Sequence, residues 1–247
     1  MRRFLFLLLA LVSLTPATAQ PLNVAAAASL TEAMRDVAKA FEAARPGVGV
    51  QLQFGASGML LQDIAGGKPA DVFASADADT LARGVQRRLL LAEAQREFAT
   101  NALVLIVPTD RSSPVQRLQD LARPEIRRIA MGRTATVPAG RYARQAIDAL
   151  RLWPALQQKI VFGDSVRAVL QAVASGDVDA GFVYATDVPV AGERVRVVQT
   201  LAVQPPIRYP ATVVAASGQQ VLARDFIAFL NQPQARAVFS RYGFGAP

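Results

Sequence analysis

The sequence predicts an α/β fold with mostly parallel sheets, on three observations. Short apolar, strand-like runs alternate with amphipathic, helix-like segments, which is the order that βαβ units produce. The 247 residues contain no cysteine, so disulfides cannot hold the chain, and a 52% apolar content provides for a large core instead. The length suits one large domain or two small ones.

The first hundred residues contain six predicted elements. Helices are predicted where apolar residues recur every three or four positions, as in the stripe of Met34, Val37 and Phe41. Strands are predicted where apolar runs are short or alternate with polar residues. The strands are Leu22–Ala27, Val48–Phe54 and Asp71–Ser75, and the helices are Thr31–Arg45, Gly58–Ala65 and Ala78–Arg87.

A long apolar strand, Ala102–Val107, opens a second block with the same alternation. The further strands are Arg128–Met131, Lys159–Phe162, Val178–Val183, Val195–Val198 and Tyr209–Ala215. The further helices are Ala139–Leu152, Ser165–Ala174, Val221–Leu230 and Pro233–Arg241. The segments near residues 100 and 208 are candidate crossings between two lobes, which periodicity alone does not establish.

The N-terminus has the three parts of a secretory signal peptide. Arg2 and Arg3 form a basic start, Phe4–Leu14 is an apolar run, and Ala17–Ala19 fits a small-residue cleavage site. The run has 11 residues, whereas a membrane-spanning helix needs about 20. We therefore expect residues 1–19 to be removed and the mature chain to be periplasmic, with an N-terminal membrane anchor as the alternative. The absence of cysteine excludes a lipoprotein anchor.

Composition removes several classes of function. The chain has no histidine, which excludes Ser-His-Asp and Cys-His catalysis and removes the commonest zinc ligand. Its 27 Lys and Arg against 19 Asp and Glu give a net charge of +8, but the arginines are spread over separate segments. We expect a solvated basic surface that steers anions, and no nucleic-acid partner.

Four turns share one design, in which a strand end is followed by a small or hydroxyl residue and then by a helix start. A helix start exposes backbone N–H groups without partners and the positive end of the helix dipole, so it suits an anion. The alternative is plain capping, with Ser29 and Ser57 capping their own helices and Pro138 in a first turn. The residues alone thus indicate only a candidate anion-binding α/β protein. The turns are Ala26–Thr31, Phe54–Met59, Thr136–Gly140 and Phe162–Val166.

The chain resembles the periplasmic molybdate-binding proteins of bacterial ABC importers over nearly all of its mature length. The matching stretches, in the family order, are Ala26–Thr31, Phe54–Leu60, Pro69–Phe73, Val137–Ala143, Asp164–Arg167, Gly181–Tyr184, Tyr209–Pro210 and Arg241–Phe244. The resemblance implies a type II periplasmic binding protein with two lobes, residues 20–101 plus 209–247 and residues 102–208, and the ligand in the cleft between them. It implies no enzyme activity, no cofactor, a monomeric state, and delivery of molybdate, and of tungstate, to a membrane permease with its ATPase subunit.

In that family two serines, two backbone amides and a tyrosine hold the oxyanion. Ser57 lies in a loop with Gly55 and Gly58, where relatives carry more serines. Tyr184 has an alternative interpretation as a core tyrosine. Molybdenum would be bound only as its oxyanion, through the same residues. Carried over residue by residue, the implied ligand-binding set is Ser29, Ser57, Ala139, Val166 and Tyr184.

A pocket of donors alone suits molybdate, which is fully ionised, whereas phosphate keeps a proton near pH 7 and needs an acceptor. Asp164 and Asp187 are close to the predicted site in sequence, and we expect their side chains to point away. Sulfate remains an alternative ligand, because its exclusion depends on the size of the cavity.

Two further alternatives are of other classes. A secreted hydrolase using Ser29 or Ser57 would need a base, but the chain has no histidine and neither serine has a Ser-x-x-Lys pattern, so Lys39 or Lys68 would have to be brought there by the fold. A pure interaction protein with no small ligand would leave the four turns without a purpose.

Overall fold

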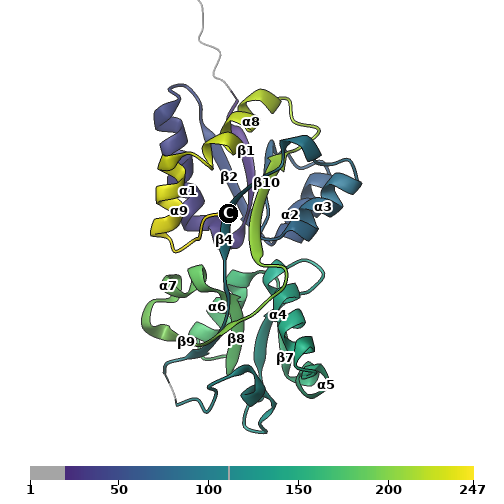
Figure 1. Ribbon diagram of the computed structural model, residues 1–247, viewed down its shortest axis with the longest axis vertical. Coiled ribbons are helices and arrows are strands. Elements are labelled where there is room, and N and C mark those ends of the chain that lie inside the picture. The colour runs from purple at the N-terminus through teal and green to yellow at the C-terminus, as the bar shows by residue number, and fades with distance from the viewer. Residues whose placement is uncertain (1–19, 111) are drawn as a thin grey trace, which may run out of the picture.

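The computed structural model describes residues 20–110 and 112–247 and shows two lobes, one above the other in Figure 1. The predicted signal peptide lies outside the described residues. Each lobe is built on one five-stranded sheet. The first sheet has the order β2 (Val50–Gly55), β1 (Leu22–Ala27), β3 (Val72–Ala74), β10 (Ile207–Val213) and β4 (Arg96–Asn101). The second has the order β7 (Ile160–Gly163), β6 (Ile129–Gly132), β8 (Ala180–Tyr184), β5 (Leu103–Pro108) and β9 (Val195–Leu201).

Both sheets are mostly parallel, as the sequence predicts. In the first sheet β10 pairs antiparallel with both of its neighbours, so the other four strands share one direction. In the second sheet β5 has the same position. In both sheets the reversed strand is the one that the chain enters directly after leaving the other lobe.

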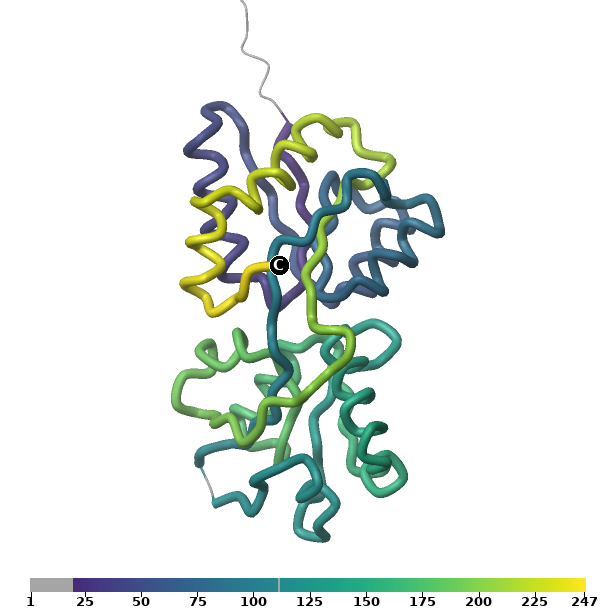
Figure 2. Tube along the Cα trace, viewed as in Figure 1, coloured from purple at the N-terminus to yellow at the C-terminus, as the bar shows by residue number. Residues whose placement is uncertain are grey.

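The chain crosses between the lobes twice, once from β4 into β5 and once from β9 into β10, and the two crossings run side by side (Figure 2). Strand β4, which precedes the first crossing, was not predicted from the sequence. Four of its six residues are polar, and its two apolar residues, Phe98 and Ala99, are adjacent and both buried. Neither an apolar run nor an alternation was therefore visible.

Helices cover both faces of each sheet (Figure 1). In lobe 1, α1 (Thr31–Ala44), α8 (Gln220–Phe229) and α9 (Pro233–Arg241) lie apart from α2 (Ser57–Ala65) and α3 (Ala78–Gln86). In lobe 2, α6 (Val166–Ala174) and α7 (Val188–Ala191) lie apart from α4 (Pro138–Ala149) and α5 (Trp153–Leu156). Within the described ranges, no helix combines the length and the apolar character that crossing a membrane requires.

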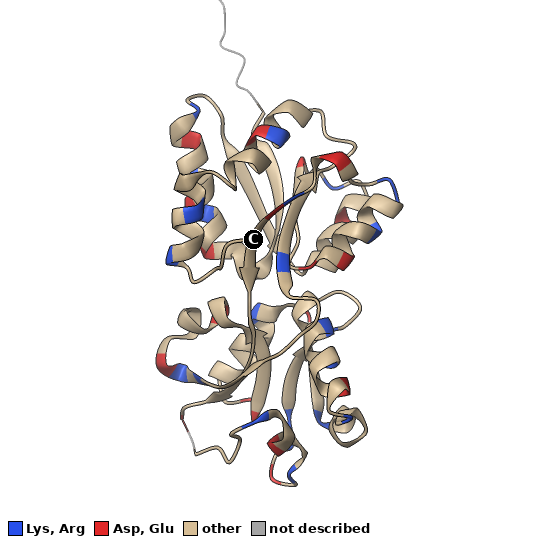
Figure 3. Cartoon of the chain, viewed as in Figure 1, with Lys and Arg blue, Asp and Glu red and all other residues tan. Residues whose placement is uncertain are grey.

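Lys and Arg positions and Asp and Glu positions are interspersed along both lobes (Figure 3).

Candidate functional site

A small cavity lies between the two lobes, and the five predicted site residues all line it. The space inside it for a water-sized sphere is about 10 Å³, against roughly 300–1,000 Å³ for pockets that hold drug-sized ligands. The cavity is therefore too small for a ligand of that size. The lining residues are Ala27, Ala28, Ser29, Gly55, Ala56, Ser57, Ala76, Val137, Pro138, Ala139, Val166 and Tyr184.

The fold brings these residues together because each follows the carboxyl end of a strand. Ser29 lies in the 3₁₀ turn after β1, and Ser57 is the first residue of α2 after β2. Ala139 is in the first turn of α4, Val166 is the first residue of α6, and Tyr184 is the last residue of β8. Ligands of α/β sheets bind at this edge, and here the two sheets present it to each other.

Each serine hydroxyl has a hydrogen-bond partner in another segment of the chain. The Ser57 Oγ accepts from the backbone N–H of Ala76 at 3.1 Å. The Ser29 Oγ lies 3.0 Å from the Tyr209 hydroxyl. Neither serine makes a helix-capping hydrogen bond, so the capping alternative is wrong for both.

The Tyr209 hydroxyl links Ser29 to Asn101. The Asn101 Nδ2 donates to the Tyr209 oxygen at 3.1 Å, and the Tyr209 hydroxyl keeps its own proton, which it can donate to Ser29. Burial raises the pKa of Tyr209 well above its usual value, which keeps that proton in place. Since a hydroxyl has one proton and two lone pairs, Ser57 keeps its proton to donate while it accepts from Ala76, and Ser29 does so when Tyr209 is the donor.

The two amide donors belong to first turns of helices, where N–H groups have no partner within the helix. Ser165 caps α6 by accepting from the N–H of Ala168 at 3.1 Å, which leaves the N–H of Val166 outside the cap. The start of α4 packs tightly on the end of β6. A Cβ added to Gly140 would lie 1.9 Å from the Gly132 oxygen, so glycine is required for this approach.

Tyr184 is fully buried and its hydroxyl reaches across to lobe 1. It donates to the Ala76 carbonyl at 3.4 Å, a long bond that a better acceptor in the cavity could replace. Burial raises the pKa of Tyr184 well above its usual value, so the hydroxyl remains a donor at neutral pH. Tyr184 is therefore both a buried core residue and a residue that lines the cavity.

Among the described residues that line the cavity, none is an acid, a lysine or an arginine. Asp164 is exposed and pairs with Arg133 at 2.6 Å. Asp187 is buried, accepts from the N–H of Tyr184 and pairs with Arg167 at 2.9 Å. The cavity is therefore lined by three side chains with hydroxyl groups, those of Ser29, Ser57 and Tyr184, and by no charged side chain among the described residues.

The structure also leaves the hydrolase alternative without a base. Lys39 pairs with Asp36 on the surface and Lys68 pairs with Asp63, and neither lysine lines the cavity. In the part of the chain that the structure describes, no group of three or more acidic, histidine or cysteine side chains is arranged to hold a metal ion.

Sequence reasoning missed Tyr209, Asn101 and Ala76, which orient the serines. Tyr209–Pro210 is one of the stretches that match the molybdate-binding proteins, which was the available signal. No signal pointed to Asn101, because it lies in the strand that was itself missed.

Comparison with known proteins agrees with this architecture. The profile of the family described as bacterial extracellular solute-binding protein matches residues 22–245. The chain is 36% identical to the putative ABC transporter substrate-binding lipoprotein YvgL of Bacillus subtilis, over 91% of this chain and 86% of that protein. It is 32% identical to the molybdate-binding protein ModA of Haemophilus influenzae, over 97% and 96% of the two chains.

The solved structures extend the agreement to three dimensions. The periplasmic molybdate-binding protein of Azotobacter vinelandii superposes with a TM-score of 0.77 at 25% identity, covering 92% of this chain and 99% of that one. This match confirms the predicted fold class, and the family is one of solute-binding proteins and not of enzymes. The chain belongs to the bacterial extracellular solute-binding proteins, in the family that includes the ModA proteins.

Proposed function

We propose that the chain binds molybdate, and tungstate, in the inter-lobe cavity and delivers it to an ABC import permease with its ATPase subunit. The observation that supports the proposal is the lining of the cavity, which contains every residue of the expected donor set. Ser29, Ser57 and Tyr184 offer hydroxyl protons, Ala139 and Val166 offer backbone N–H groups, and no charged side chain lines the cavity. A fully ionised tetrahedral oxyanion offers only acceptors, so such a cavity satisfies it.

Lobe closure is the mechanism of capture in this proposal. We take lobe 1 as residues 20–101 plus 209–247 and lobe 2 as residues 102–208. The two serines then belong to lobe 1, while the two amides and Tyr184 belong to lobe 2. Only a closed arrangement brings all five donors to one ion, so the ligand favours closure through the contacts that it gains there.

The family places the protein outside the cytoplasm. We further propose that residues 1–19 are a cleaved signal peptide, that the mature protein is periplasmic, and that it acts as a monomer. Mass spectrometry of the secreted protein tests the cleavage, because its mass should equal that calculated for the chain without residues 1–19. Light scattering of the purified protein tests whether it is a monomer.

Calorimetry with four oxyanions tests the ligand. We expect tight binding of molybdate and tungstate and much weaker binding of sulfate and phosphate. Sulfate has the same charge and shape with shorter bonds, so it would leave some donors too far away, and protonated phosphate would face donors with its own O–H group. Sulfate binding as tight as molybdate binding would contradict the assignment and favour a general sulfate-type oxyanion protein.

A further inference from the structure

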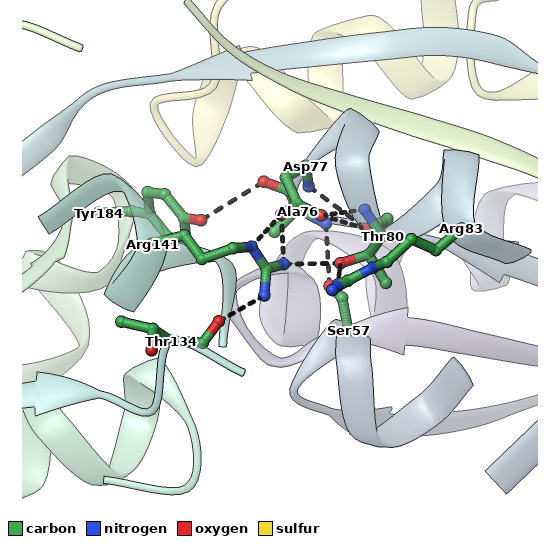
Figure 4. Close-up of polar contacts among 9 residues, drawn as sticks. Ser57, Ala76, Asp77, Thr80, Arg83, Thr134, Arg141 and Tyr184 are labelled. Carbon is green, nitrogen blue, oxygen red and sulfur yellow. Dashed lines mark hydrogen bonds and ion pairs between the residues drawn. The ribbon is translucent and has the colours of Figure 1, made fainter. Parts of the chain in front are cut away.

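Two arginines bridge the lobes beside the cavity without lining it. Arg141 of α4 donates through Nε to the Asp77 carboxylate at 2.9 Å, and its Nη2 contacts the Thr80 hydroxyl at 2.6 Å (Figure 4). Arg167 of α6 forms a two-pronged ion pair with Glu32 of α1, at 3.1 and 2.5 Å. We call these contacts the Arg141 latch and the Arg167 latch.

Each latch is carried by a helix that also provides a cavity donor. Arg141 comes two residues after Ala139, and Arg167 directly follows Val166. A cation in the first turn of a helix is unfavourable with the helix dipole, so these positions do not serve the helices themselves. Each arginine finds its carboxylate partner across the cleft.

Both latches are anchored and partly shielded from water. Arg141 also donates to the Thr134 carbonyl of its own lobe at 3.0 Å, and Arg167 also pairs with the buried Asp187. Asp77 is held by Ser75 and by the N–H of Thr80. Both arginine side chains are only 20% exposed. Forming such an ion pair costs less side-chain entropy than forming a surface pair, and salt screens it less.

We propose that Arg141 and Arg167 are positioning residues that set ligand affinity by holding lobe 2 closed on lobe 1, without touching the ligand. The inference rests on the proposed function, oxyanion binding in the cavity. A ligand that binds only the closed state has an apparent affinity that rises with the population of that state. Breaking one latch lowers this population and so weakens binding, even when every donor is intact.

The test uses the fact that the latch residues of lobe 2 are positively charged and their partners in lobe 1 are negatively charged. Arg141→Gln removes a positive charge from lobe 2, and Glu32→Gln removes a negative charge from lobe 1. An electrostatic effect on an anion would move the affinities of the two variants in opposite directions. The latch predicts that both bind molybdate about tenfold more weakly in calorimetry, which corresponds to about 1.4 kcal/mol.

Arg133→Gln is the matched control. Arg133 lies in the same turn as Thr134 and pairs with Asp164 of its own lobe, with both side chains more than half exposed. It should change affinity less than about twofold, because an exposed pair contributes little. Unchanged binding in both latch variants, or tighter binding by Glu32→Gln, would overturn the inference.

Inter-lobe distances give a second measurement that needs no ligand. The chain has no native cysteine, so Lys39→Cys on α1 and Gln171→Cys on α6, both exposed, can carry spin labels selectively. We expect the closed population to fall in both latch variants relative to the labelled parent, and equal populations would overturn the latch. A parent that binds none of the four oxyanions would instead refute the proposed function, so the two failures are distinguishable.

Discussion

The two lobes support the proposed site in different ways. Lobe 1 contributes the hydroxyls of Ser29 and Ser57, which rotate and are hydrogen-bonded to Tyr209 and to the N–H of Ala76. Lobe 2 contributes one hydroxyl, that of Tyr184, and the proposed backbone N–H donors, whose direction is set by the starts of α4 and α6. A mobile donor needs a second layer of partners, whereas a helix amide is oriented by the helix itself.

This difference decides how each lobe can be perturbed. In lobe 1, a single substitution can remove a serine hydroxyl or the side chain that orients it. An amide of lobe 2 is removed only by proline, which also fixes the backbone angle φ, so the two amides are better tested together by a change that keeps lobe 2 away from lobe 1. The following variants are ordered from the largest expected effect to the smallest.

Gly58→Ala should have the largest effect, because it keeps the lobes apart. The N–H of Gly58 donates to the Thr136 carbonyl across the cleft at 2.9 Å, and an added Cβ would lie 2.7 Å from that residue's backbone. Loss of closure removes three donors together, so we expect molybdate affinity to fall by at least about 3 kcal/mol, more than 100-fold. Gly218→Ala, whose Cβ meets nothing within 4 Å, is the control for calorimetry. Normal affinity in Gly58→Ala would show that the observed closure is not needed.

Tyr184→Phe removes the one side-chain donor of lobe 2. A hydrogen bond to a charged group contributes about 1.5–3 kcal/mol, so calorimetry should show binding at least roughly tenfold weaker. The melting temperature without ligand should change little, because the ring still fills its buried site and the bond to Ala76 is long. Unaltered affinity would remove Tyr184 from the ligand set.

Tyr209→Phe tests the support of the lobe 1 donors. The Ser29 hydroxyl would lose its hydrogen bond to Tyr209 and would no longer be oriented by it toward the cavity. The expected loss is about 1 kcal/mol, or roughly fivefold in affinity. Ser29→Ala combined with Tyr209→Phe should then bind no worse than Ser29→Ala alone. Additive losses in this double-mutant cycle would show that Tyr209 does not act through Ser29.

The buried Asp187 of lobe 2 predicts a small pH effect on stability. Burial raises its pKa to about 6 in spite of the nearby Arg167, with Glu32 adding to the rise. A carboxyl whose pKa is higher in the folded state binds more protons there, so its contribution to stability grows as the pH falls from 7 towards 4.

Comparison with Asp187→Asn separates the contribution of Asp187 to the pH dependence of stability from the contributions of other carboxyl groups. Asp36 and Asp120 have lowered pKa values and act in the opposite direction. Between pH 7 and pH 5.5 the parent should gain about 1 kcal/mol relative to the variant, or roughly 2–4 °C in melting temperature. A constant difference between the two proteins across this range would show that Asp187 does not titrate there.

The sequence by itself predicted most of the elements, and the family resemblance supplied the candidate donors. Helix α9 was predicted with its observed bounds because Pro233 marks its start and apolar residues repeat along it. The strand-end turns were visible because small residues, hydroxyls and helix starts are local features within a few residues of one another. The family motifs then assigned Ser29, Ser57, Ala139, Val166 and Tyr184 to one site.

Only the tertiary structure decided how that site is supported and closed. Ser29 and Tyr209 are 180 residues apart, and Arg167 and Glu32 are 135 residues apart, so no local pattern could pair them. Strand β4 escaped notice because its burial comes from its neighbours in the sheet and not from its own periodicity. Hydrogen bonds and ion pairs between distant segments depend on where the fold places them, and a one-dimensional pattern carries no such distances.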